Sequence, residues 1–345
     1  MNPQKMTVTI AQFELAQQLL NDYFQRTGIY GKGNKKRRYL WTDAIALRAL
    51  FTLNNDNNQS HAEMLVETVH NVLGKFRDDD HRKGWISGLP EEEGSQHPTS
   101  RGLRIGKHMP ERQPDEPFDQ QLEWERDGQY FHYNSQWVFA LLQAYNEIGE
   151  KKYLDWATEM IKASEKFIYC NAEPAGMYWK MSTDLTHPLV RSMGAHDPLE
   201  GLIACESILA AAESKKMEIG DLRNQFEYLC QSKSWTTTDP LGLGILLNNV
   251  NQSVAILQAN EKVPAPMHPR KLLDDCFYGL ESFVNQFNPT ANADQRLAFR
   301  ECGLSHGLRQ VWHKKALVSK SVPEVDALDR FIHLRRTTDS LSAYQ

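Results

Sequence analysis

Residues 199–212 read LEGLIACESILAAA, and as a helix this segment would be apolar on nearly every face. A helix of that kind is expected to be buried on most sides. The next segment, residues 218–231, differs because Leu222, Phe226 and Leu229 recur at helical spacing among polar residues. It is therefore predicted to be an amphipathic helix that covers the buried one.

The same alternation runs along the whole chain. Amphipathic outer helices are predicted at about residues 9–27, 59–74, 151–168, 218–231 and 270–287. Buried inner helices are predicted at about residues 42–54, 129–148, 198–213, 240–258 and 296–314. A further helix is expected at 322–335 and a short one at 340–344, too short to complete the last hairpin.

Alternating inner and outer helices in this number predict an all-α fold, an (α/α)6 toroid or six-hairpin barrel. The alternative is an open α-solenoid, which usually repeats units of similar length. Here the unit lengths vary widely, and no Gly/Ser-rich linker divides the chain. We therefore expect one domain over residues 1–345.

Composition excludes several classes of protein. The chain has 345 residues, 41% of them hydrophobic, which indicates a folded protein with a core. Its net charge of -5 makes nucleic acid an improbable partner. Apolar runs long enough to cross a bilayer are missing, as is a secretory signal. Five scattered cysteines favour reduced thiols, so a cytoplasmic location without a membrane partner is expected.

The links that lead from outer to inner helices are long, and in a barrel they would all gather at one mouth. The longest spans residues 75–128 and mixes charged residues with aromatic and aliphatic ones. We expect an ordered flap that turns at Gly84, Gly88, Gly102 and Gly106. The link after residue 170 contains MYWKMS at 177–182, whose alternation predicts a short strand or hairpin arm.

Polar and aromatic residues cluster where the inner helices begin. The clusters are RYLWTD at 38–43, EWERDGQYFHY at 123–133, SMGAHDP at 192–198, WTTTDP at 235–240 and REC at 300–302 with His306 one turn on. Aromatic faces stack on sugar rings, while carboxylates and amides bind hydroxyl groups. A saccharide or related polyol is therefore the favoured ligand.

Some of these residues have a structural explanation. Asp197-Pro198 and Asp239-Pro240 both resemble a helix N-cap followed by proline in the first turn. Cys302 and His306 are spaced for a shared zinc ion, but paired metal motifs are missing from the sequence and a core thiol is the simpler interpretation of Cys302. We expect neither a metal nor another cofactor.

Five of the motifs resemble a family of uncharacterised bacterial proteins related to the six-hairpin glycosidase superfamily. They are RYLWTD at 38–43, GWISG at 84–88, RDGQYFH at 126–132, YWKMS at 178–182 and SMGAHD at 192–197. The resemblance covers most of the chain. It implies an (α/α)6 toroid and carbohydrate chemistry, although the superfamily includes glucosidases and unsaturated uronyl hydrolases, and sugar epimerases share a neighbouring toroid.

The leading hypothesis is a glycoside hydrolase, because cleavage needs a carboxylic acid and a second carboxylate. Asp127 and Asp197 are the predicted acid/base pair, with His132 and His196 orienting the substrate. Predicted substrate-binding residues are Trp41, Asp43, Arg126, Tyr130, Trp179, Glu301 and His306. The alternatives are a sugar epimerase or isomerase that uses histidine bases, and a barrel that binds carbohydrate without catalysis.

Overall fold

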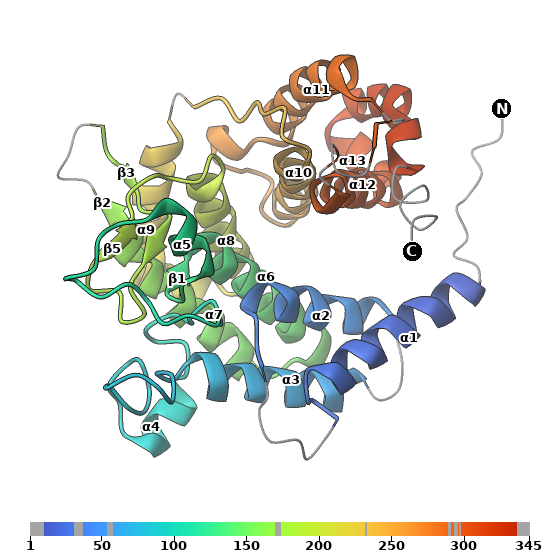
Figure 1. Cartoon of the computed structure of the whole chain (residues 1–345). Helices are drawn as coiled ribbons and strands as arrows, with labels where there is room; N and C mark the ends of the chain where they lie inside the picture. The colour runs from blue at the N-terminus through green and yellow to red at the C-terminus, as the bar shows by residue number, and fades with distance from the viewer. Residues whose placement is uncertain are drawn as a thin grey trace. The chain divides into compact units, whose positions relative to one another are not determined.

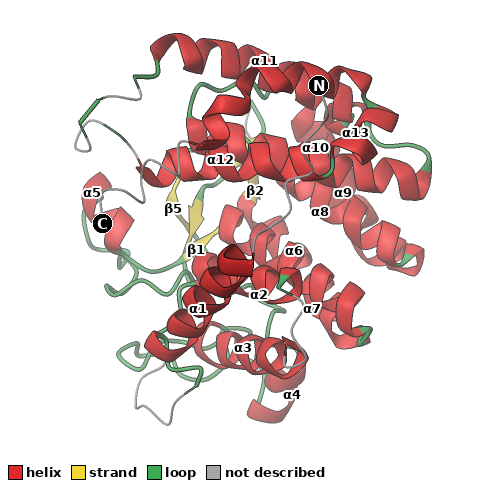
Figure 2. Cartoon of the chain, turned by 90° about the vertical axis from the view of Figure 1, so that its right-hand side faces the viewer, coloured by secondary structure: helices red, strands yellow, loops and turns green. Residues whose placement is uncertain are grey.

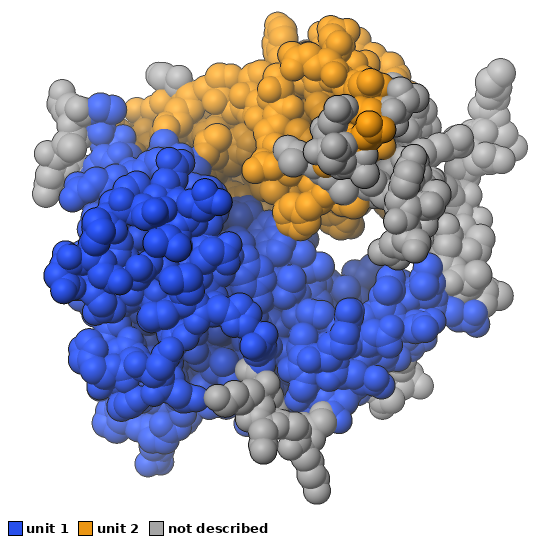
Figure 3. All heavy atoms as spheres, in the orientation of Figure 1, with its two compact units in different colours: residues 1–194 blue, residues 195–345 orange. Residues whose placement is uncertain are grey.

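The computed structural model is mostly helical, as the sequence predicts (Figures 1 and 2). It describes residues 10–30, 37–53, 58–169, 174–231, 233–288, 291–292, 296 and 298–336. The chain divides into two compact units, residues 1–194 (unit 1) and residues 195–345 (unit 2) (Figure 3). The helix expected at 340–344 lies outside the described residues.

Unit 1 is built from helices that pack in the order outer, inner, inner, outer. Its helices are α1 (Ile10–Arg26), α2 (Leu40–Thr52), α3 (Asn58–Leu73), α4 (Glu91–Gln96), α5 (Gln120–Glu125), α6 (Phe131–Ile148), α7 (Lys151–Ala163) and the 3₁₀ helix η1 (Ser164–Phe167). The inner helices α2 and α6 pack against each other, α3 covers α2, and α7 covers α6. Leu47 of α2 and Trp137 of α6 are fully buried at this core.

Unit 2 repeats the same scheme. Its elements are α8 (Asp197–Ala211), η2 (Glu213–Lys215), α9 (Lys216–Cys230), α10 (Pro240–Asn260), η3 (Ala265–Met267), α11 (Pro269–Gln286), α12 (Ala298–His313), α13 (Lys315–Ser321) and η5 (Pro323–Arg336). The inner helix α10 packs against α8 and α12, while α9 covers α8 and α11 covers α10. Helices α10 and α12 approach closely at Gly244 and Gly303, where a Cβ atom on Gly244 would lie 2.1 Å from the Gly303 carbonyl oxygen.

The ten long predicted helices all exist, and most of their ends lie within two residues of the expected positions. Three short helices were missed: α4 and α5 within the range 75–128, and α13 after α12. The segment expected as an α-helix at 322–335 is instead the 3₁₀ helix η5. Six- and seven-residue helices are too short to show a hydrophobic period, which is why the sequence does not reveal them.

Short strands connect the helices of unit 1. The strands β1 (Gln129–Tyr130), β4 (Lys180–Met181) and β5 (Pro188–Val190) form an antiparallel sheet in the order β1-β4-β5. The strands β2 (Ile168–Tyr169) and β3 (Gly176–Met177) form a second antiparallel pair. The predicted strand at 177–182 is thus confirmed, divided between β3 and β4.

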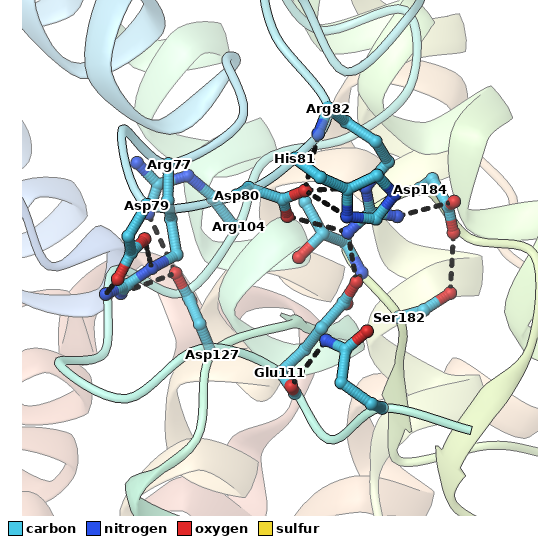
Figure 4. Close-up of polar contacts among 12 residues, drawn as sticks. Arg77, Asp79, Asp80, His81, Arg82, Arg104, Glu111, Asp127, Ser182 and Asp184 are labelled. Atoms are coloured by element: carbon cyan, nitrogen blue, oxygen red, sulfur yellow. Dashed lines mark hydrogen bonds and ion pairs between the residues drawn. The ribbon is translucent and has the colours of Figure 1, made fainter. Parts of the chain in front are cut away.

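The long segment 75–128 is described throughout, and it buries Trp85, Leu103 and Ile105. The four glycines predicted to turn it all have positive φ angles, between 72° and 91°. Arg82 joins this segment to the loop after β4, because its guanidinium contacts Asp80, Glu111 and, at 2.8 Å, Asp184 (Figure 4).

Three of the four described cysteines, Cys205, Cys230 and Cys276, are buried free thiols. The fourth, Cys302, is exposed, so its interpretation as a core thiol is wrong. On α12 the neighbours Glu301, Leu304 and Ser305 are buried, which leaves Cys302 on the opposite side of the helix.

Among the described helices, none combines the length and the apolar character needed to span a bilayer.

Candidate functional site

A cavity of about 250 Å³ lies in unit 1, between α5 and the three-stranded sheet. We call it the aromatic pocket. Its lining residues are Phe118, Gln120, Glu123, Trp124, Tyr130, Trp179, Val190, Arg191 and Ser192. Two of them, Tyr130 and Trp179, are among the predicted substrate-binding residues.

The sheet register explains why residues so distant in the sequence meet here. Tyr130 of β1 stands opposite Lys180 of β4, which in turn stands opposite Val190 of β5. Side chains that oppose one another across neighbouring strands lie on the same face of a sheet. Trp179 directly precedes β4, and its backbone N–H donates to the Ser192 carbonyl at 2.7 Å.

Three aromatic rings of the pocket contact one another. The rings of Tyr130 and Trp179 are nearly parallel, with centroids 5.8 Å apart and an angle of 24° between planes. Trp124 meets Trp179 edge-on, with centroids 4.7 Å apart. Trp124 is 44% exposed and Phe118 is 57% exposed, so the pocket presents aromatic surface to incoming molecules.

The charges of the pocket are unevenly paired. Glu123 is buried and binds the Arg112 guanidinium at 2.5 Å and the Lys180 ammonium at 3.3 Å. Lys180 also donates to the Glu123 and Arg126 carbonyl oxygens. Burial lowers the pKa of Lys180, and the Glu123 carboxylate opposes that shift. Arg191 is exposed and has no acidic partner among the described residues, so it is the pocket's available cation.

Asp127, a predicted catalytic residue, is fully buried, and its carboxylate faces the Arg104 and Arg77 guanidinium groups (Figure 4). Its Oδ2 accepts from Arg104 at 2.8 Å, and its Oδ1 accepts from the backbone N–H groups of Gly106 and Lys107. Arg77 lies 3.8 Å from Oδ2. These contacts describe a structural carboxylate, and a catalytic role for Asp127 stays a prediction.

Asp43 is also fully buried. Its carboxylate lies 3.2 Å from the Arg38 guanidinium and accepts a 2.6 Å hydrogen bond from the Tyr23 hydroxyl. Burial raises the pKa of Asp43 to about 6, although Arg38 and Tyr23 oppose the shift. The contacts join α1 to α2 and do not bring Asp43 to the lining of the aromatic pocket.

The other predicted residues of unit 1 lie close to the aromatic pocket without lining it. The Trp41 ring contacts the His132 and Tyr133 rings in tilted arrangements, with centroids 4.7 Å and 5.3 Å apart. Tyr133 in turn contacts Tyr130. Arg126 pairs with Glu116 at 2.7 Å, which raises the pKa of Arg126. Aromatic contacts therefore continue from the pocket to α2.

Unit 2 holds the remaining predicted residues. His196 is buried, and its Nε2 lies 3.0 Å from the Trp235 carbonyl oxygen. Asp197 is buried too, whereas His306 is exposed. Glu301 is buried and is bound by Arg296 through Nε, at 3.1 Å, and through Nη2.

The N-cap interpretation is right for one aspartate and wrong for the other. Asp239 caps α10, accepting from the Gly242 N–H at 2.8 Å, and it also binds Arg300. Helix α8 begins one residue earlier than expected, with His196 at the N-cap and Asp197 already within the helix. Asp197 is therefore not the cap residue.

Sequence reasoning did not single out Gln120, Val190 or Ser192 as lining residues of one pocket. Gln120 begins a six-residue helix, Val190 ends a three-residue strand and Ser192 lies in the loop after that strand, so no periodic pattern marks an exposed face. Within the described part of the chain, no group of three or more His, Cys, Asp or Glu side chains is arranged to hold a metal ion.

No protein-family model matches this sequence, and no curated protein matches it either. The function must therefore be argued from the residues themselves.

Proposed function

We propose that the protein binds a saccharide or a related polyol in the aromatic pocket of unit 1. The stacked pair of Tyr130 and Trp179, with Trp124 edge-on beside it, carries the proposal. Aromatic faces match the C–H surface of a sugar ring, which is flat and apolar on one side. Tyr130 is buried beneath Trp179, so the aromatic surface accessible for this contact is that of half-buried Trp179 and of exposed Trp124 and Phe118.

The polar groups of the pocket suit hydroxyl recognition. Gln120 supplies an amide with both donors and an acceptor, and Ser192 supplies a hydroxyl. Arg191 adds a guanidinium without an acidic partner among the described residues, which donates hydrogen bonds in a fixed fork. Ligand pockets combine a mostly apolar lining with a few such polar groups.

The size of the pocket favours a small ligand or one unit of a chain. Its volume of about 250 Å³ lies just below the roughly 300–1,000 Å³ typical of pockets for drug-sized molecules. A single sugar ring therefore suits the pocket better than a large cofactor.

Binding is favoured over hydrolysis at this pocket. Glycoside cleavage needs two carboxyl groups roughly 5–10 Å apart. Among the described residues that line the pocket, Glu123 is the one carboxylate, and Arg112 and Lys180 hold it. Hydrolysis by Asp127 and Asp197, like epimerisation by histidine bases, stays a prediction from the sequence.

We also propose that the chain is a six-hairpin toroid and acts in the cytoplasm. In each unit the inner helices pack against one another and each outer helix covers its own inner partner, which supports the toroid. The free thiols among the described residues support a reducing compartment. An experimental structure of the whole chain tests the toroid directly.

The binding proposal is tested by calorimetric titration with glucose, galactose, mannose, glucuronate, N-acetylglucosamine and cellobiose. We expect at least one of them to bind, and Trp179→Ala to raise its Kd about tenfold, equivalent to about 1.4 kcal/mol. Trp312→Ala is the matched control, since Trp312 is a half-buried tryptophan of α12 in unit 2. Failure of every sugar to bind, or equal weakening by both substitutions, would contradict the proposal.

A further inference from the structure

Unit 1 contains a second cavity, of about 300 Å³, between α3, α7 and the segment that carries Trp85 and α4. We call it the α3–α7 cavity. Its lining residues are Glu63, Val66, Glu67, His70, Asn71, Trp85, Ser95, Lys152, Tyr153 and Trp156. None of them lines the aromatic pocket, so it is a separate site.

The sequence places these residues on one face of each helix. Glu63, Glu67 and His70 of α3 are spaced four and three residues apart, and such positions stack on one side of a helix. On α7, Lys152 and Trp156 are likewise four residues apart. Two polar helix faces therefore meet at this cavity, with Glu67 and Lys152 exposed and Glu63 half-buried.

Aromatic rings form the inner wall. Trp156 stands perpendicular to both Tyr153 and His70, with ring centroids 5.7 Å and 4.8 Å away. The faces of these rings already attract cations of the protein, since the Lys152 ammonium lies 5.1 Å from the Tyr153 centroid and the Lys75 ammonium lies 4.4 Å from that of Trp85. The negative face of an aromatic ring is what a cation binds.

The cavity's acidic side chains are not neutralised by basic ones. Glu63 accepts a hydrogen bond from Gln59, and neither Glu63 nor Glu67 has a basic partner among the described residues. The nearby Lys152 ammonium is instead paired with Glu150 at 2.6 Å. The lining thus offers two carboxylates whose charge is available to a ligand.

The buried groups at the base add no positive charge. His70 Nε2 accepts a 3.1 Å hydrogen bond from the Trp137 indole, and burial lowers the pKa of His70 to about 3. The imidazole is therefore neutral near pH 7. The Tyr153 hydroxyl is buried and unpartnered within the described residues, and it lines the same cavity as Glu63. Burial raises the pKa of Tyr153, and the negative charge of Glu63 adds to that shift.

We propose that the α3–α7 cavity binds a small organic cation, of the substituted ammonium type, between the Glu63 and Glu67 carboxylates and the Trp156 and Tyr153 rings. The carboxylates supply the charge attraction, and the rings supply the cation–π contact. Lys152 occupies part of this position as an exposed side chain and competes with the ligand.

The experiment is a titration of the full chain with choline chloride at constant ionic strength, followed by tryptophan fluorescence and calorimetry. We expect saturable binding with a Kd of about 1 mM, the affinity that one cation–π site with weak ion pairs supports. The uncharged isostere 3,3-dimethylbutan-1-ol should bind at least about tenfold more weakly, since it lacks the charge. Equal binding of the isostere, or no saturation by about 50 mM choline, would overturn the proposal.

Variants at exposed positions keep the test independent of folding. Glu67→Gln should raise the Kd for choline about three- to fivefold, and Lys152→Gln should lower it, because a competing cation is removed. Glu147→Gln, an exposed carboxylate of α6 outside the cavity, should leave it unchanged. Equal changes in the Kd for choline on Glu147→Gln and Glu67→Gln would refute a specific site. The site would also be refuted if sugars bound to this cavity more tightly than choline does.

Discussion

Replacement of Asp127 by asparagine tests whether this carboxylate has a structural or a catalytic role. Asparagine keeps one oxygen for the Gly106 and Lys107 N–H groups, but it replaces the other with an amide nitrogen that faces the Arg104 guanidinium, 2.8 Å from Oδ2 in the wild type. A donor then meets a donor, and a nearly buried cation loses its anion.

Breaking a buried ion pair by removing one partner costs about 3–5 kcal/mol. Arg104 also donates to the Lys75 and Val72 carbonyl oxygens, which continue to bind it in the variant. We therefore expect the lower end, about 3 kcal/mol. For a unit of this size, that corresponds to a fall in Tm of about 6–12 °C.

Differential scanning calorimetry of wild type, Asp127→Asn and Asp78→Asn measures this loss. Asp78 is an exposed aspartate of the same segment, so its substitution makes the same chemical change and should shift Tm by little. Equal Tm values for Asp127→Asn and Asp78→Asn would refute the structural interpretation. If Asp127→Asn also abolished hydrolysis of a glycoside while folding stayed intact, the catalytic prediction from the sequence would gain instead.

Three further predictions test other parts of the structure. Gly244→Ala should destabilise unit 2 by at least about 2 kcal/mol in urea unfolding, because its Cβ would collide with the Gly303 carbonyl oxygen. An unchanged urea midpoint would show that α10 and α12 are further apart than this structure places them. Burial lowers the pKa of His70 to about 3, below that of histidine in the unfolded chain. The free energy of unfolding should therefore be highest above about pH 6.5 and fall as the pH drops toward 3. In chemical denaturation between about pH 4 and 7, His70→Gln should flatten this pH dependence, and the same pH dependence in wild type and variant would contradict the prediction. Arg191→Ala should weaken glucuronate binding more than glucose binding, by about three- to tenfold in calorimetry, and an equal loss for both sugars would exclude Arg191 from carboxylate recognition.

The long helices could be predicted because their hydrophobic period extends over several turns. Their inner or outer class also followed from the sequence: α6 and α8 are apolar on most faces and are largely buried, whereas α7 buries one side. The turns of the segment 75–128 were predictable for a local reason, since Gly102 and Gly106 adopt positive φ angles that favour glycine.

The side-chain partners could not be predicted in the same way. The carboxylate of Asp127 is bound by Arg104 and by Arg77, which is fifty residues away in the chain, and nothing in the local pattern indicates that pairing. The sequence therefore indicated Asp127 as a candidate acid, but it did not indicate that the Asp127 side chain is buried. Tyr130 was recognised because aromatic residues beside helix starts are unusual, and Trp179 because it lies in the predicted strand or hairpin arm at 177–182. Their shared pocket, in contrast, depends on the register of two-residue strands.

Saccharide binding at the aromatic pocket is tested most sharply by a crystal structure of the chain soaked with the sugar that binds most tightly. We expect a sugar ring in the aromatic pocket, with its C–H face within about 4 Å of the Trp179 indole. A sugar bound elsewhere on the chain, with the Trp179 ring uncovered, would contradict the proposal.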